Sequence, residues 1–173
     1  MNIFKDASSK YRPNEIKCLL VGESPPSEVK NYFFLAPNAD LYNFTKQAFE
    51  IAFPDKLKES DNFLDFFKNL GCFLDDLCEE PINNIRTNKI IRKEKWKESI
   101  KSLENRIRNY NPQVIICISK QIEENIEKSI LQSEVRLKYF KTICYPAFKK
   151  ERIENYINEL SKILILLKNE KFF

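Results

Sequence analysis

The sequence predicts an α/β fold in which a central, mostly parallel four-stranded sheet lies between two layers of helices. Four short runs of β-branched and aliphatic residues alternate with longer segments of helical periodicity. Each run holds at least three consecutive apolar residues, which is typical of strands covered on both faces of a parallel sheet. The chain has 173 residues, so a single domain, 1–173, has enough length to bury a three-layer core.

Strands are predicted at 17–21, 72–76, 113–118 and 141–145. The first run ends at Gly22, one of only two glycines in the chain, where the backbone can turn at a place that would crowd a side chain. Pro25 and Pro26 then stiffen the exit from this strand. The last run is stopped by Pro146, which cannot donate to a strand ladder.

The residues that follow the first strand are candidates for a ligand site. In open parallel sheets, ligands bind in the crevice beyond the carboxyl ends of the strands. Glu23 and Ser24 are predicted to lie in that crevice. An ordinary turn from strand to loop is the alternative interpretation of the same residues.

Helices are predicted between and after the strands. Segment 94–110 carries apolar residues at steps of four and three, which places them on one face: Trp96, Ile100, Leu103, Ile107 and Tyr110. Segment 150–168 has the same order of periodicity. A further helix is predicted at 61–70, where Gly71 is suited to end it.

The composition excludes several kinds of chemistry. The chain has no histidine, which rules out Ser-His-Asp and Cys-His nucleophile systems and the zinc deaminase signature. Neither a Walker phosphate loop nor a dinucleotide-binding glycine fingerprint is present. The five cysteines are scattered and form no C-x-x-C pair, so we expect no metal site and no iron–sulfur cluster. Any chemistry must come from carboxylates, hydroxyls, amides and backbone dipoles.

The charges are segregated along the chain. Residues 40–84 carry a net charge of −6, whereas 85–110 carry +6 and 133–152 carry +4. This segregation predicts a basic face that meets phosphates, with a solvated helix face as the alternative. No apolar run reaches membrane-spanning length and no signal-peptide core is present, so we expect a cytoplasmic protein without membrane contact.

Several motifs occur in a fixed order along the chain. Gly22-Glu-Ser-Pro25 follows the first strand, an aromatic segment with asparagines occupies 31–42, and Tyr145-Pro146 follows the last strand. Together with the strand motifs at 71–77 and 112–118, this set resembles the uracil-DNA glycosylase superfamily. In that family a Gly-(Glu or Gln)-x-Pro motif follows the first strand and a late strand ends in His-Pro. The resemblance covers residues 16–150.

The resemblance implies roles for residues of the base pocket. Gly22 and Glu23 match the first motif in the form used by the branch that carries an iron–sulfur cluster, a cofactor that the cysteine spacing here does not support. Ser24 falls where other branches have the Asp or Asn that positions the attacking water. The ring against the flipped base would come from Phe34, with Phe33 as the alternative, and the amide that reads the base edge from Asn38.

The resemblance also implies roles beyond that pocket. Tyr145 stands in place of the family's histidine and would donate its hydrogen bond to the leaving base. Lys149 and Lys150 match the loop that family members press into the minor groove. Asp75 or Asp76, at the end of the second strand, could add a second carboxylate to the crevice.

Each of these residues also has a structural interpretation. Phe34 could belong to the core, and Asn38 could cap the helix that follows it. Asp75 and Asp76 could cap or shape a loop, Tyr145 could end a strand, and the two lysines could be a solvated helix start.

The sequence therefore predicts a monomeric DNA glycosylase-like enzyme that acts on a uracil-related, damaged or modified base. The oxocarbenium-like state formed when an N-glycosidic bond breaks can be stabilised by carboxylates, and Glu23 could orient the attacking water. The alternative is a catalytically silent module that binds nucleic acid or a nucleobase on the same fold. A hydrolase of free nucleosides or nucleotides is a third hypothesis.

Overall fold

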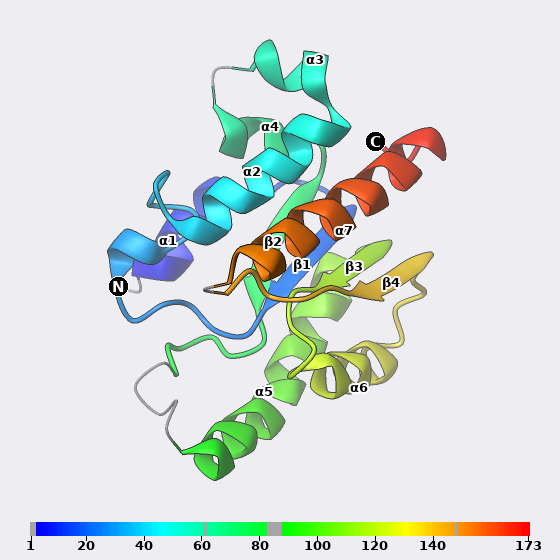
Figure 1. The fold of residues 1–173 in the computed structure, drawn as a ribbon. Coiled ribbons are helices and arrows are strands. Elements are labelled where there is room, and N and C mark those ends of the chain that lie inside the picture. The colour runs from blue at the N-terminus through cyan, green and yellow to red at the C-terminus, as the bar shows by residue number, and fades with distance from the viewer. Residues whose placement is uncertain (1–2, 61, 83–87, 148) are drawn as a thin grey trace.

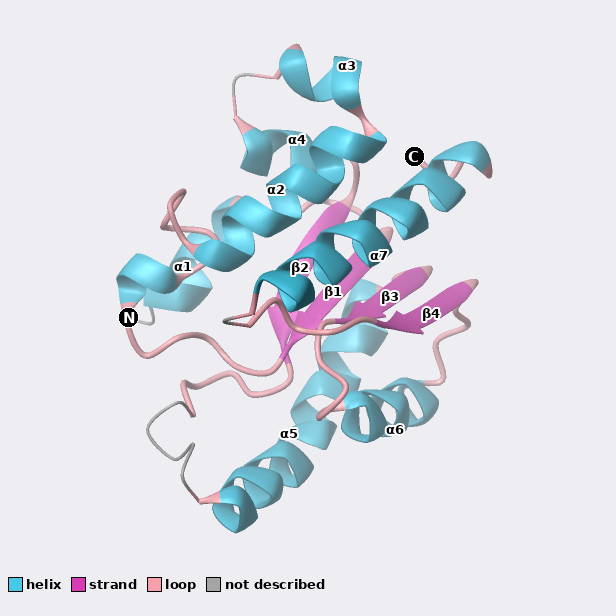
Figure 2. Cartoon of the chain, viewed as in Figure 1, coloured by secondary structure: helices cyan, strands magenta, loops and turns pink. Residues whose placement is uncertain are grey.

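The computed structural model describes residues 3–60, 62–82, 88–147 and 149–173 (Figures 1 and 2). Four strands form one sheet: β1 (Cys18–Gly22), β2 (Cys72–Asp76), β3 (Val114–Cys117) and β4 (Tyr139–Thr142). Around it lie α1 (Ile3–Lys10), α2 (Asp40–Ala52), α3 (Pro54–Lys58), α4 (Phe63–Asn69), α5 (Lys89–Tyr110), α6 (Glu123–Ser133), α7 (Lys150–Asn169) and the short 3-10 turn η1 (Val29–Asn31).

The sheet is parallel throughout, with strand order β2-β1-β3-β4. In β1, Cys18 is opposite Cys72 of β2 on one side and opposite Val114 of β3 on the other. At the far end of β1, Gly22 is opposite Asp76. The strand order reverses direction between β1 and β3, because β2 lies on one side of β1 and the later strands lie on the other.

Helices cover both faces of the sheet, which confirms the three-layer α/β/α prediction. Figure 1 shows α2 and α7 packed together over one face, while α5 and α6 pack together over the opposite face. The central strands are fully buried, as expected for apolar runs enclosed by helices on both sides. Among the described residues, no helix is long and apolar enough to cross a membrane.

Local side-chain and backbone features set the helix ends. The Asn88 side chain accepts hydrogen bonds from the backbone N–H groups of Ile90 and Ile91, so α5 begins at Lys89, five residues earlier than the periodicity predicts. Asn62 caps α4 in the same way, and residue 61 of that predicted helix lies outside the described residues. Gly71 ends α4 with a φ of 74°, a left-handed conformation that glycine adopts without strain.

The fourth strand starts two residues earlier and ends three residues earlier than the sequence predicts. It spans Tyr139–Thr142 rather than 141–145, because its pairing partner β3 runs from Val114 to Cys117 and fixes where the ladder starts and stops. The last ladder bond runs from the N–H of Ile143 to the carbonyl of Cys117. The chain leaves the sheet before it reaches Pro146, so β3 and not the proline ends this strand.

Candidate functional site

The carboxyl edge of the sheet gathers the ends of all four strands. Because the strands are parallel, the loops after β1 and β2 and the segment from β4 to α7 emerge at the same edge, as Figure 1 shows. The register places Gly22 directly beside Asp76, so the Gly22-Glu23 motif and the Asp75-Asp76 pair are neighbours. The sequence predicted these two groups separately, and the sheet brings them together.

Glu23 is held by two side chains of α5. Arg92 donates from Nε to Oε1 of Glu23 at 2.5 Å and pairs through Nη2 with Oε2. The indole Nε1 of Trp96 donates to the same Oε1 at 2.8 Å, and the Arg92 guanidinium lies 5.3 Å from the Trp96 ring. The hydrogen bond from Arg92 to Glu23 raises the pKa of the arginine. Glu23 therefore ties the loop after β1 to the start of α5.

Asp75 has both carboxylate oxygens engaged. Its Oδ2 lies 2.5 Å from Nη1 of Arg106, and its Oδ1 accepts the backbone N–H of Asp76 at 2.8 Å. The two side chains of the ion pair are only 19% and 15% exposed. Arg106 also donates to the backbone carbonyl of Leu77 at 3.1 Å, which fixes α5 against the end of β2.

Asp76 occupies a different environment from its neighbour. A Cβ on residue 22 would overlap the Oδ1 of Asp76, so the absence of a side chain at Gly22 makes room for this carboxyl group. Burial, reinforced by the negative charges of Asp75 and Glu23 and opposed by Arg106, raises the pKa of Asp76 to about 8. This raised pKa favours the protonated form of the Asp76 carboxyl group.

A cleft of about 510 Å³ lies between α1, β2 and the carboxyl-terminal part of α5. Its polar lining includes Arg12, Tyr32, Asp75, Asp76, Arg106 and Tyr110. Burial and the adjacent Asp75 raise the pKa of Tyr110 to about 12, so this phenol keeps its proton. The cleft thus presents a carboxyl group of raised pKa, a carboxylate–guanidinium pair and phenolic hydroxyls to a ligand.

The predicted base-pocket rings are part of the core. Phe34 is 3% exposed and lies against the rings of Tyr11, Tyr32, Phe33 and Phe73. Phe33 is equally buried. Neither ring offers an uncovered face to a base in this conformation. Asn38 is exposed and lies two residues before α2, whose N-cap position is Ala39.

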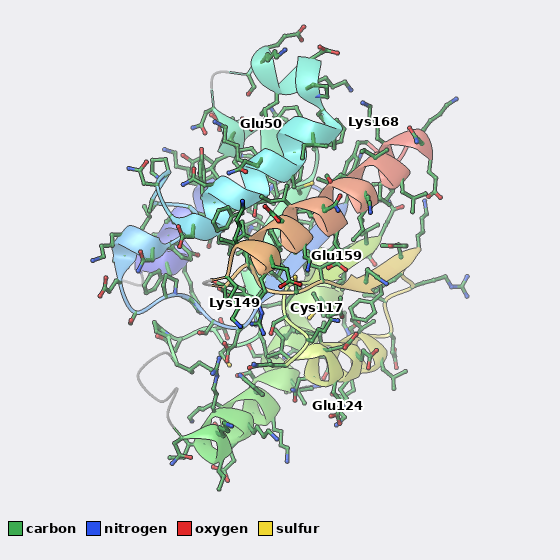
Figure 3. All side chains as sticks on the ribbon, in the orientation of Figure 1. Glu50, Cys117, Glu124, Lys149, Glu159 and Lys168 are labelled. Carbon is green, nitrogen blue, oxygen red and sulfur yellow. The ribbon has the colours of Figure 1, made fainter. Side chains whose placement is uncertain are left out.

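Tyr145 and the two predicted DNA-contacting lysines lie between β4 and α7. Tyr145 is 46% exposed, directly before the buried Pro146. Lys149 immediately precedes α7, and Figure 3 shows it where the chain enters that helix. Lys150 is exposed in the first turn and lies 3.7 Å from Glu154. Ser24 is half-buried in the loop after β1.

Three α5 residues of the site were not predicted from the sequence. The apolar stripe of the predicted helix includes Trp96, which is buried. Its indole N–H also donates a hydrogen bond to Glu23. Arg92 and Arg106 belong to a basic helix, and the sequence does not indicate which carboxylates they pair with. The only available signal was their spacing, since Arg92 and Trp96 are four residues apart and therefore share one helix face.

A second cleft of about 540 Å³ lies over α2, α3 and α4. It is lined by residues of these helices and their flanking segments: Pro37, Tyr42, Lys46, Glu50, Pro54, Leu57, Lys58, Ser60, Asn62 and Phe63. Glu50, labelled in Figure 3, projects from α2 on this side. None of the predicted site residues lines this cleft.

Within the described ranges, no group of three or more His, Cys, Asp or Glu side chains is arranged to hold a metal ion. Comparison with known proteins finds no family model that matches the chain and no match among curated proteins.

Proposed function

We propose that the chain is a DNA glycosylase-like enzyme that hydrolyses the N-glycosidic bond of a uracil-related, damaged or modified base. The proposal rests on the resemblance of its motifs to the uracil-DNA glycosylase superfamily and on the residues gathered at the carboxyl edge of the sheet. The observation that carries it is the pairing of Gly22 with Asp76, which brings Glu23 close to Asp75 and Asp76; the two aspartates, but not Glu23, line a cleft of about 510 Å³.

This set of groups suits the reaction. Breaking an N-glycosidic bond builds positive charge on the sugar, and carboxylates stabilise such a state electrostatically. Glu23 and Asp75 are each held in one orientation by an arginine, so the positions of their carboxylates are fixed. Tyr145 follows the last strand at the same edge and would donate to the departing base.

Basic residues surround this edge and support a nucleic-acid substrate. The ion pair between Glu23 and Arg92 holds the first turns of α5 there, and α7 begins after the segment that leaves β4. Exposed lysines occur on these elements and on the loop after β3: Lys89, Lys93, Lys120, Lys149 and Lys150. Phosphate contacts by such lysines would make binding strongly dependent on salt.

The test is release of a base from defined oligonucleotides. The protein is incubated with strands that carry uracil, hypoxanthine, xanthine or a modified cytosine, and abasic sites are detected by alkaline cleavage on a gel. We expect cleavage of at least one substrate and its loss in Glu23→Gln. The matched control is Glu50→Gln, an exposed carboxylate on α2 outside the site, which should cleave as the wild type does.

Binding is measured on the same oligonucleotides as a function of salt. Each of Lys149→Ala and Lys150→Ala should lower the slope of log K against log salt by about 1. Lys56→Ala, an exposed lysine on α3, should leave the slope unchanged. Equal slopes in all three variants would contradict a DNA contact at the start of α7.

One observation favours the second candidate, a binding module without catalysis. Glu23 already accepts hydrogen bonds from Arg92 and Trp96, so its carboxylate oxygens are less available to orient a water molecule. If no substrate is cleaved while salt-sensitive binding persists, the binding module replaces the enzyme.

A further inference from the structure

We propose that Asp76 is the proton donor of this site and that the base it releases is a purine such as hypoxanthine or xanthine. The inference rests on the proposed function and adds to it the acid and the class of base. It answers the question that the sequence left open, which of the two adjacent aspartates does the chemistry.

The contacts separate the two aspartates. Asp75 is committed to Arg106 through an ion pair at Oδ2 and accepts the backbone N–H of the next residue at Oδ1. Among the described residues, no hydrogen bond or ion pair reaches the carboxyl oxygens of Asp76. Asp76 also lines the cleft. Its carboxyl group is therefore the one that can exchange a proton with a bound ligand.

The position of Asp76 depends on Gly22. Its Oδ1 fills the space that any side chain at residue 22 would need, which seats the carboxyl over the end of the central strand. This is the edge at which parallel sheets bind ligands. One of only two glycines in the chain is thus used to admit this carboxyl group.

The charged and titratable groups around Asp76 come from each element packed against it. The loop after β1 contributes Glu23, β2 contributes Asp75, α5 contributes Arg106, and the flanking segments contribute Tyr32 and Cys78. Burial and the two carboxylates outweigh the single guanidinium, so the acid form persists to about pH 8. A general acid works best when its pKa lies near the working pH.

The reaction balances with water as the only co-reactant. The bond between the anomeric carbon and the base nitrogen breaks, its electron pair goes to the base, and Asp76 transfers its proton to a ring nitrogen of the base. Water adds to the anomeric carbon, and the proton that this water loses returns to the Asp76 carboxylate. The products are the free neutral base and the sugar with a new hydroxyl group.

This chemistry selects among bases. A neutral purine has a ring nitrogen with a lone pair that can take the proton, so its departure gains the full benefit of an acid. Neutral uracil has no such ring nitrogen and leaves as an anion that hydrogen bonds can stabilise. An acid at Asp76 should therefore matter far more for hypoxanthine or xanthine than for uracil.

The test compares base release from hypoxanthine- and uracil-containing oligonucleotides under single-turnover conditions between pH 5 and 10. We expect Asp76→Asn to slow hypoxanthine release by about 10²–10⁴-fold, the usual contribution of a general acid, and to slow uracil release much less. Wild-type hypoxanthine release should fall above about pH 8, and this decline should be absent in the residual activity of Asp76→Asn. Asp65→Asn, an exposed aspartate on α4, is the matched control.

The outcomes distinguish the two proposals. Release of uracil without release of either purine would leave the glycosylase standing and overturn the role of Asp76. Equal losses for both bases, or an unchanged alkaline decline in Asp76→Asn, would also overturn it. If the wild type releases no base from any substrate, both proposals fail. The wild-type pH profile needs no variant, so it remains decisive even if Asp76→Asn folds poorly.

Discussion

Replacing Gly22 by alanine tests the close approach between β1 and the Asp76 carboxyl. The added methyl would overlap the Oδ1 of Asp76, while the next nearest atoms are the Cγ of Asp76 at 3.6 Å and the backbone oxygen of Asp75 at 3.9 Å. These longer distances are ordinary contacts, so one oxygen atom accounts for the whole conflict. The φ of Gly22 is not positive, so the alanine backbone itself is unstrained.

The expected cost is that of inserting one methyl group into a packed site. Overpacking of this kind lowers the free energy of unfolding by about 1–3 kcal/mol. For a chain of this size, 2 kcal/mol corresponds to a fall in Tm of about 4–8 °C. Thermal and urea denaturation followed by circular dichroism would measure both quantities for Gly22→Ala and the wild type.

A double-mutant cycle makes this prediction refutable. In an Asp76→Ala background the conflicting oxygen is gone, so Gly22→Ala should cost less than about 0.5 kcal/mol, which gives a coupling of about 1–2 kcal/mol. Additive effects of the two substitutions would refute the reasoning, because they would mean that the methyl at residue 22 meets something other than the Asp76 carboxyl.

Three further predictions concern pH and buried polar contacts. Because the pKa of Asp76 is about 8 in the folded protein and lower when unfolded, the unfolded state binds fewer protons between about pH 4 and 8, so stability should fall as pH rises through this window. Urea titrations should show this decline at up to about 1.4 kcal/mol per pH unit for the one group, and Asp76→Asn should flatten it relative to the wild type. Arg106→Met should cost about 3 kcal/mol because it leaves the Asp75 carboxylate partly buried without its cation, and the double variant with Asp75→Asn should recover part of that loss; no recovery would contradict a direct pairing. Thr45→Val should cost about 1–3 kcal/mol in chemical denaturation because it leaves the hydroxyl of Tyr156, now 2.8 Å from the threonine oxygen, buried without a partner, whereas Thr45→Ser should cost less; equal costs would argue against the hydrogen bond.

The sheet could be predicted from sequence because its central strands carry a strong signal. Residues 114–118 are continuously apolar and β3 is buried at every position, so burial and sequence pattern agree. The edge strand β4 is only half-buried, so its sequence lacks that signal and its bounds follow from the register with β3. Helix α1 has no fully buried residue, and only Phe4 and Ala7 of this helix pack against the core, so its apolar signal in the sequence is short.

The site was less predictable because its partners are distant in sequence. Glu23 pairs with Arg92, 69 residues later, and nothing in either local sequence specifies this partner. The motif at Gly22 predicted a backbone position without room for a side chain. Only the structure shows that the atom occupying this space is the Oδ1 of Asp76, on the neighbouring strand β2. The sequence could predict which residues follow the ends of the parallel strands. It could not predict their individual contacts, because these are made by side chains of the packed helix α5.

The strand order has a consequence for how the chain reaches its native state. β1 ends at Gly22, but its neighbour β3 begins only at Val114, after β2 and the whole of α5. During synthesis, β1 and β2 can pair first. The other edge of β1 then stays unpaired until β3 has left the ribosome. Such non-local pairing slows folding and exposes an unpaired strand edge to other chains. We expect refolding yields to fall with protein concentration, and amino-terminal fragments that stop before residue 114 to aggregate.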